Sequence, residues 1–336
     1  MTQLPEILTA DELTTLLATS EHPRLARELV EAAVGLIADD PALLDLKIAT
    51  AALQEMREAF TKFAPYRGIR KVTVFGSARV KPNDALYLQA KEVSRCLAAK
   101  GWMIITGAGP GIMEAAMEGA GREHSFGVNI RLPFEQGANA VIAGDEKLVS
   151  MKYFFTRKLM LMKESSAFVC LPGGFGTLDE TFELITLTQT GKGVPVPIVF
   201  LDTPGDPYWE HVHNFAGTQL VTRGLVAAGD LALYRVTDSP DVAVEEITRF
   251  FNNYHSQRYV GDVLFLRLHR APTATQLAAL NAAFGDLCAR GTITASAPHP
   301  AEIADDDELR LHRLRFRFDK RQYGRLRQLI DAMNAW

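Results

Sequence analysis

The sequence has few of the features that mark secreted, membrane or disulfide-linked proteins. It contains three cysteines in 336 residues, Cys96, Cys170 and Cys288, far apart and without a Cys-x-x-Cys pair. This excludes a disulfide-rich scaffold and favours free thiols in a reducing compartment. No run of about 18 apolar residues is present to cross a bilayer, and the first residues lack a charged-then-apolar leader. We therefore expect a cytoplasmic protein with no membrane partner.

A strong charge and a metal-ligand pattern are also missing. The net charge of −4 argues against general attraction to nucleic acid. Residues 256–336 carry 12 Lys and Arg against 9 Asp and Glu, too small an excess for a nucleic-acid site. The eight histidines show no His-x-x-x-His spacing, and His211 and His213 are typical of surface residues. We expect no metal, no cofactor and no nucleic-acid partner.

The order of apolar and amphipathic stretches predicts an α/β fold. Residues 1–66 look helical throughout, and from Lys71 to about Asn253 short apolar runs alternate with helical patterns such as 85–99 and 112–122. Such alternation predicts a Rossmann-like, doubly wound parallel sheet. The predicted strands are 72–75, 102–105, 126–130, 167–171 and 197–201.

The last 80 residues have a different pattern. Strands are expected at 262–269, 292–295 and 309–318, with a helix at 275–290 and another at the end. The pentad Leu-Arg-Leu-His-Arg occurs at 266–270 and at 309–313, and the two strands that contain it are expected to pair. We therefore divide the chain into a helical segment (1–66), a Rossmann-like domain (67–255) and a small α+β module (256–336).

One strand of the module has a basic face. Arg313, Arg315 and Arg317 alternate with Leu314, Phe316 and Phe318. A solvated edge or a subunit contact would explain this pattern, and a site for an anionic regulator is the alternative.

Three predicted strands of the central domain end in glycine-rich loops. Residues 171–180 read LPGGFGTLDE, so that a buried strand is followed by three glycines and then a helix that begins with two acids. The free N–H groups at such a helix N-terminus favour an anion. The other two loops contain Gly76 and Ser77, and Gly107, Gly109 and Gly111. Each loop could be only a tight turn, but three at one sheet edge favour a ligand site.

The spacing of the glycines narrows the choice of ligand. A dinucleotide fingerprint would place Gly-x-Gly-x-x-Gly after the first strand, with an acid about 20 residues later. Here the glycines follow the second strand as Gly-x-Gly-x-Gly, and no Gly-Lys-Ser/Thr of a P-loop is present. A mononucleotide or a sugar phosphate therefore fits better than NAD or ATP.

A helical stretch at 152–160 supplies two cations just before the strand that leads into the decapeptide. Arg157 and Lys158 are adjacent on it, a pattern that is most often a solvated surface. Because the helix leads into the strand at 167–171, both side chains could also reach the ligand edge, where an arginine suits an oxyanion.

Taken together, these motifs resemble the Lonely Guy family of nucleotide phosphoribohydrolases. The resemblance covers about residues 70–250 and rests on Tyr-Phe-Phe-x-Arg-Lys at 153–158, Pro-Gly-Gly-x-Gly-Thr-x-x-Glu at 172–180, Gly-x-Gly-Pro-Gly-Ile-Met-Glu at 107–114, and Gly-Ser at 76–77. It implies a homodimer or higher homo-oligomer that cleaves purine nucleoside 5′-monophosphates, AMP or N6-modified AMP, to free base and ribose 5-phosphate.

The same resemblance implies roles for individual residues. Arg157 and Glu180 would be the catalytic pair, and the substrate would be bound by Gly76, Ser77, Gly107, Gly109, Gly111, Met113, Glu114, Lys158, Gly173, Gly174, Gly176 and Thr177. A carboxylate at Glu180 could stabilise positive charge on the ribose and activate water. Arg157 would act electrostatically because a guanidinium stays protonated.

Several alternatives remain open. Glu180 and Glu114 are also the acids that a helix dipole favours in a first turn, Met113 is also a packing residue, and Asp179 is expected to face solvent. A carrier that binds a nucleotide or phosphate-containing cofactor without chemistry is the second functional class. A decarboxylase ranks last because nothing identifies a Schiff-base lysine. The helical segment and the C-terminal module depart from short family members, so the preferred base and the oligomeric state are undetermined.

Overall fold

The computed structural model describes residues 9–131 and 137–336, which divide between Arg57 and Glu58 into two compact units. The first unit is helical, with α1 (Ala10–Thr19), α2 (Pro23–Ala38) and most of α3 (Leu43–Phe63). A capping box starts α1, in which the Thr9 hydroxyl accepts from the Glu12 N–H while the Glu12 carboxylate accepts from the Thr9 N–H. The helical prediction is confirmed for the described residues of this segment.

The second unit is built on a seven-stranded, all-parallel sheet in the order β4-β3-β2-β1-β5-β6-β7. Its strands are β1 (Lys71–Phe75), β2 (Met103–Thr106), β3 (Ser125–Ile130), β4 (Leu148–Met151), β5 (Ala167–Cys170), β6 (Ile198–Leu201) and β7 (Arg235–Thr237). The strand order reverses between β1 and β5, and ligands of such sheets bind outside the carboxyl ends of the strands at that reversal. The doubly wound α/β prediction is confirmed.

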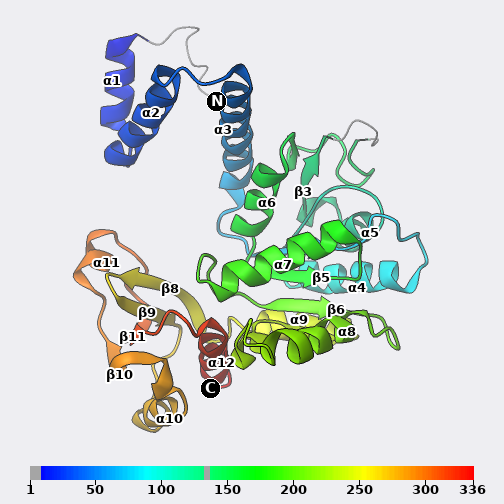
Figure 1. Cartoon of the computed structure of the whole chain (residues 1–336), viewed down its shortest axis with the longest axis vertical. Coiled ribbons are helices and arrows are strands. Elements are labelled where there is room, and N and C mark those ends of the chain that lie inside the picture. Colours follow the sequence, from blue (N-terminus) through cyan, green and yellow to red (C-terminus); the bar gives the residue numbers. More distant parts are fainter. Residues whose placement is uncertain (1–8, 132–136) are drawn as a thin grey trace. The chain divides into compact units, whose positions relative to one another are not determined.

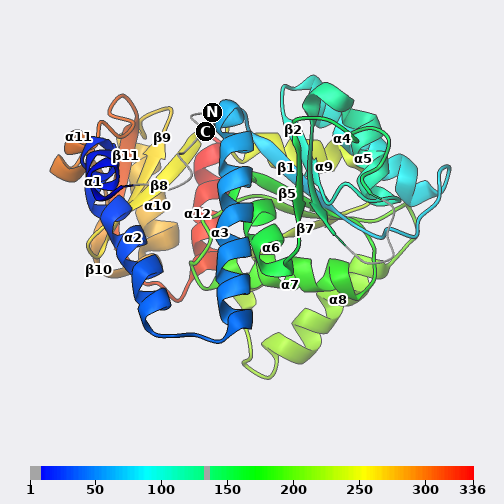
Figure 2. The same cartoon turned by 90° about the horizontal axis from the view of Figure 1, so that it is seen from above.

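Helices cover both faces of this sheet (Figure 2). One layer contains α4 (Ala85–Ala99), α5 (Ile112–Ala120) and α9 (Pro240–Arg249), whose apolar side chains form one core with β1, β2, β5 and β6. The other layer contains α6 (Phe154–Lys163), α7 (Phe175–Gln189) and α8 (Tyr208–Phe215). Most of the central strands are buried along their whole length, which explains why short continuous apolar runs predicted them correctly.

Two strands of the central sheet were not predicted, and both lie at its edges. β4 reads Leu-Val-Ser-Met and β7 reads Arg-Val-Thr, and neither is buried along its whole length. Such short, partly polar runs resemble loops in sequence, because an edge strand has a neighbour on one side only.

The C-terminal module is a four-stranded antiparallel sheet, drawn apart from the central sheet in Figure 1. Its elements are β8 (Tyr254–Val260), β9 (Val263–Leu268), α10 (Ala274–Phe284), β10 (Cys288–Ser296), α11 (Pro300–Ala304), β11 (His312–Phe318) and α12 (Tyr323–Asn334). They form two ββα units that meet where β9 pairs with β11, in the sheet order β10-β11-β9-β8. The predicted pairing of these two strands is confirmed.

Some details of the module differ from the prediction. The helix expected over 275–290 ends at Phe284, where a 3-10 turn (Gly285–Leu287) follows, and Cys288 already begins β10. β8 was missed because its sequence, Tyr-His-Ser-Gln-Arg-Tyr-Val, is mostly polar. The repeated pentad is not a structural repeat: most of the first copy lies at the end of β9, whereas most of the second copy lies in a turn before β11.

The last helix, α12, ties the module to the central domain. The side-chain oxygen of Asn334 accepts hydrogen bonds from the backbone N–H groups of Asn253 (2.9 Å) and Tyr254 (2.8 Å), where the module begins. The Arg327 guanidinium pairs with Glu246 of α9. At the other end of α12, the backbone at Gly324 lies against that of Gly229, in a 3-10 segment (Ala228–Leu233) of the central domain.

None of the described helices is both long and apolar enough to cross a membrane. The three cysteines are free thiols, and Cys170 is buried in β5.

The contact at Gly324 gives a prediction for stability. A Cβ at this position would lie 2.0 Å from the carbonyl oxygen of Gly229. We expect Gly324→Ala to lower the free energy of unfolding by about 1–3 kcal/mol, the usual cost of overpacking. Chemical denaturation measures this cost, with Gly285→Ala as the control because its Cβ would meet nothing within 4 Å. Equal stability of the two variants would contradict the prediction.

Candidate active site

A cavity of about 940 Å³ lies at the carboxyl ends of β1, β2 and β5. All three glycine-rich loops line it, as does α6. Twelve of the fourteen residues named from the sequence are brought together there: Gly76, Ser77, Gly107, Gly109, Met113, Arg157, Lys158, Gly173, Gly174, Gly176, Thr177 and Glu180.

The other two residues lie behind this lining. Gly111 has φ +68°, and a Cβ on it would lie 2.5 Å from the carbonyl oxygen of Ser77. The Ile112 N–H donates to the same oxygen at 3.1 Å, so Gly111 allows the loops after β1 and β2 to touch. Glu114 is half-buried on α5 and does not line the cavity.

The Arg157–Glu180 pair is the charged centre of the cavity. The distance between Arg157 Nη1 and Glu180 Oε1 is 3.6 Å, and the two side chains are only 11% and 14% exposed. Arg157 Nε also donates to the carbonyl oxygen of Val128 at 3.1 Å, which anchors the guanidinium to β3. A Cβ on Gly107 would lie 2.1 Å from Arg157 Nη2, so the absence of a side chain there makes room for the guanidinium.

Burial raises the pKa of the Glu180 carboxyl above its ordinary value, because removal of water disfavours the charged form. The positive charges of Arg157 and Lys158 oppose this shift. Glu180 is therefore a carboxyl group that titrates above the usual range and lies beside a fixed cation. Such a combination is typical of functional sites.

The loop after β5 forms the N-terminus of α7. Gly174 precedes the first turn, no side chain caps it, and a Cβ on Gly174 or Gly176 would meet nothing within 4 Å. Thr177 lies against Gly173, whose carbonyl oxygen accepts a 2.7 Å hydrogen bond from the Tyr208 hydroxyl. The backbone N–H groups of this turn are therefore open to an anion, which the helix dipole also favours.

Lys158 lines the cavity and also takes part in ion pairs between two helices. Its Nζ pairs with Asp179 at 2.7 Å and with Glu183 at 2.8 Å, so two carboxylates already neutralise it. Burial lowers the pKa of Lys158, but the bonds to Asp179 and Glu183 outweigh burial and raise it overall. Lys158 thus joins α6 to α7, and Asp179 is exposed as expected.

Several cavity residues were not selected from the sequence. Tyr208 comes from α8, Asn129 from β3, and Phe154 and Phe175 from the starts of α6 and α7. Nothing in the sequence marks Tyr208, because it follows a loop far along the chain from the motifs. Arg79, in the loop after β1, lies three residues beyond Gly76 and could have been chosen from that motif. Among residues 9–131 and 137–336, no group of three or more His, Cys, Asp or Glu is placed to hold a metal.

Comparison with known proteins finds similarity in the central domain. Residues 111–247 match the family model described as "Possible lysine decarboxylase". A probable cytokinin riboside 5′-monophosphate phosphoribohydrolase of Oryza sativa subsp. japonica is 27% identical over 54% of this chain and 73% of its own. The cytokinin riboside 5′-monophosphate phosphoribohydrolase of Mycobacterium marinum is 28% identical over 52% of this chain and 91% of its own.

The resemblance to the Lonely Guy family is confirmed. The matches fall on the central domain and leave much of the chain unmatched. The cytokinin riboside 5′-monophosphate phosphoribohydrolase LOG of Oryza sativa subsp. japonica is 32% identical, but the matched part spans 41% of this chain and only 58% of that enzyme.

Solved structures give a weaker likeness. The molybdenum cofactor binding protein of Rippkaea orientalis is 19% identical over 54% of this chain and 96% of its own, with a TM-score of 0.38. The molybdenum cofactor carrier protein of Chlamydomonas reinhardtii is 20% identical over 54% and 97%, with a TM-score of 0.36. At these values the likeness carries no information about what the central domain binds.

The raised pKa of Glu180 predicts a pH-dependent difference in stability. When the pKa of a carboxyl is higher in the folded state than in the unfolded state, the folded protein binds more protons between the two values. The free energy of unfolding therefore falls as the pH rises through this range. Glutamine does not ionise. The melting temperature of Glu180→Gln minus that of the wild type should therefore increase between pH 4 and pH 7.5. Calorimetry at several pH values measures this difference in melting temperature. Glu123→Gln is the control, because Glu123 is exposed. A difference for Glu180→Gln that stays constant or falls with pH would contradict the prediction.

Proposed function

We propose that the protein hydrolyses the N-glycosidic bond of purine nucleoside 5′-monophosphates, AMP or N6-modified AMP, to free base and ribose 5-phosphate. The observation that carries the proposal is the nearly buried Arg157–Glu180 pair, 3.6 Å apart, in the same cavity as an open helix N-terminus. The names of the relatives support this reaction class. Purely non-catalytic binding of an anion would not require a buried carboxylate next to the anion site.

In the proposed complex, the phosphate lies at the N-terminus of α7. The N–H groups near Gly174 and Gly176, and the Thr177 hydroxyl, would bind its oxygens, because nothing in the fold covers these glycines. The ribose would then lie toward Glu180, one turn further along α7. The base would lie toward Met113 and Asn129, which line the cavity on the side of β2 and β3.

Glu180 would act on the anomeric carbon. As the bond from C1′ to the base nitrogen breaks, positive charge develops on the ribose, and an ionised carboxylate stabilises it. Water then forms the new C1′–O bond and gives one proton to Glu180, and transfer of this proton to the departing base nitrogen yields the neutral base and ribose 5-phosphate and leaves Glu180 ionised again. A raised pKa suits a group that must accept this proton near neutral pH. Arg157 cannot donate a proton; it would hold Glu180 in place and offset the cost of its charge.

The activity is tested by incubating the protein with AMP, GMP, IMP, CMP and isopentenyladenosine monophosphate, and measuring free base and ribose 5-phosphate by chromatography. We expect base release from the purine nucleotides. Glu180→Gln should reduce kcat by about 10²–10³-fold, the usual effect of removing one group that stabilises transition-state charge.

A control separates loss of chemistry from loss of folding or binding. Glu180→Gln should still be stabilised against heat by AMP, because the phosphate loop is unchanged. If the wild type releases no base from any of the five nucleotides, the hydrolase proposal fails. If AMP nevertheless raises its melting temperature, the protein is a carrier instead.

We also propose that the protein is a homo-oligomer that uses the surface formed by α6 and the first half of α7. Five large apolar side chains there are 42–92% exposed: Phe154, Phe155, Leu159, Phe175 and Phe182. So many exposed apolar side chains on two neighbouring helices are typical of an interface rather than of a free surface. A cytoplasmic location, expected from the free cysteines, stays a prediction.

Charged residues on this surface should dissociate the oligomer. Phe155→Glu combined with Phe182→Glu places two carboxylates in the proposed interface, and sedimentation should then give a smaller species than the wild type. Leu88→Glu is the control, because Leu88 is also exposed but lies on α4, across the sheet. An unchanged sedimentation coefficient for the double variant, or a monomeric wild type, would rule out the interface.

A further inference from the structure

One face of the C-terminal sheet is rich in arginine. The opposite face, with Leu264, Leu266 and Leu314, packs into the core of the module. Cross-strand pairing places Arg267 beside Arg313, Arg258 and Arg315 on either side of Phe265, and Arg317 beside Arg290. The arginines on this face are Arg258, Arg267, Arg290, Arg313, Arg315 and Arg317.

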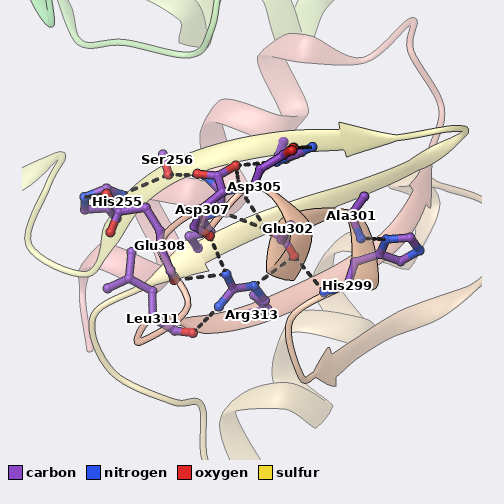
Figure 3. A network of polar contacts seen from close by, with 12 residues as sticks. His255, Ser256, His299, Ala301, Glu302, Asp305, Asp307, Glu308, Leu311 and Arg313 are labelled. Atoms are coloured by element: carbon purple, nitrogen blue, oxygen red, sulfur yellow. Dashed lines mark hydrogen bonds and ion pairs between the residues drawn. The ribbon is translucent and has the colours of Figure 1, made fainter. Parts of the chain in front are cut away.

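An acidic segment of the same chain covers one half of this face. Glu302 of α11 is fully buried and accepts from Arg267 (2.8 and 3.0 Å) through one oxygen and from Arg313 (3.0 Å) through the other. Asp307 accepts from Arg258 and Arg267. Figure 3 shows Arg313 enclosed by this segment.

The solvated edge considered for this strand is therefore wrong at Arg313, which is 1% exposed. Its guanidinium donates to the Glu302 carboxylate and to the backbone carbonyls of Asp307, Glu308 and Leu311. On this half of the sheet, carboxylates of the same chain neutralise the arginines.

The other half of the face is uncovered. Arg290, Arg315 and Arg317 line a hollow of about 270 Å³, together with Thr292 and Thr294. Arg317 pairs with the exposed Asp262, and Arg290 is 3.9 Å from the same carboxylate. Among the described residues, no carboxylate lies within ion-pair distance of Arg315. The three guanidinium groups thus have a single neighbouring carboxylate, Asp262, which Arg315 does not contact.

We infer that this hollow binds a small molecule with two or more adjacent phosphate groups. A guanidinium group binds phosphate oxygens in pairs, and the Thr292 hydroxyl adds a donor, whereas that of Thr294 donates to the Arg315 carbonyl oxygen. Arg315 and Arg317 are two residues apart on one strand, about 7 Å, a spacing that a compact polyanion bridges.

The lining also argues against a nucleic acid. Binding of single strands requires exposed aromatic rings on which bases stack. The aromatic residues on this part of the sheet, Phe265 and Phe316, are 2% and 3% exposed, so they offer no such platform.

The test is calorimetric titration of the full chain with sodium pyrophosphate at low salt. The double variant Arg315→Ala/Arg317→Ala is compared with Arg310→Ala/Arg321→Ala, which removes two exposed arginines of the same module outside the hollow. We expect the first variant to weaken one pyrophosphate-binding event at least 10-fold and the second to leave it unchanged. Orthophosphate should bind the wild type at least 10-fold more weakly than pyrophosphate.

Each other outcome overturns the inference. If pyrophosphate binds both variants as it binds the wild type, its site lies elsewhere, for example at the N-terminus of α7. If the wild type shows no binding up to millimolar pyrophosphate, the hollow is not a site. If orthophosphate binds equally well, the ligand class is wrong. Because the measurement involves no turnover, its result is independent of the proposed hydrolysis.

Discussion

A nearly buried carboxylate stays charged more readily when a cation lies beside it, and the candidate active site depends on this condition. Glu180 comes from α7 and Arg157 from α6, so the two helices must be held in one register on the same face of the sheet. The bond from Arg157 to Val128 and the free space at Gly107 fix the guanidinium from the other side. The pair therefore depends on β2, β3, α6 and α7 together.

Close contacts explain several of the glycines around the cavity. At Gly107 a side chain would displace Arg157, at Gly111 it would separate the loops after β1 and β2, and at Gly173 it would lie 2.2 Å from the Thr177 hydroxyl. In contrast, Gly174 and Gly176 face open space. The first three positions need glycine for the fold, and the last two are the ones where a ligand can approach the backbone.

Much of this arrangement could be predicted from the sequence, because its signals are local. Short apolar runs predicted the central strands, and glycines at their ends predicted which loops would meet. The signal fails where tertiary structure decides: β4, β7 and β8 are short or polar, and Tyr208 reaches the cavity from a distant helix. The burial of Arg313 could not be foreseen, since alternation places Arg313, Arg315 and Arg317 on one face but does not show that Glu302 covers only the first.

The hydrogen bonds of Asn334 to Asn253 and Tyr254 close the C-terminal module into a noncovalent ring. Closing so long a loop has an entropic cost that is recovered only when the last helix packs into place. During synthesis, the central domain can form its sheet before α12 has left the ribosome, but the surface at Gly229 stays uncovered until then. This contact therefore constrains the order of folding during synthesis: the parallel sheet can form before the ring closes.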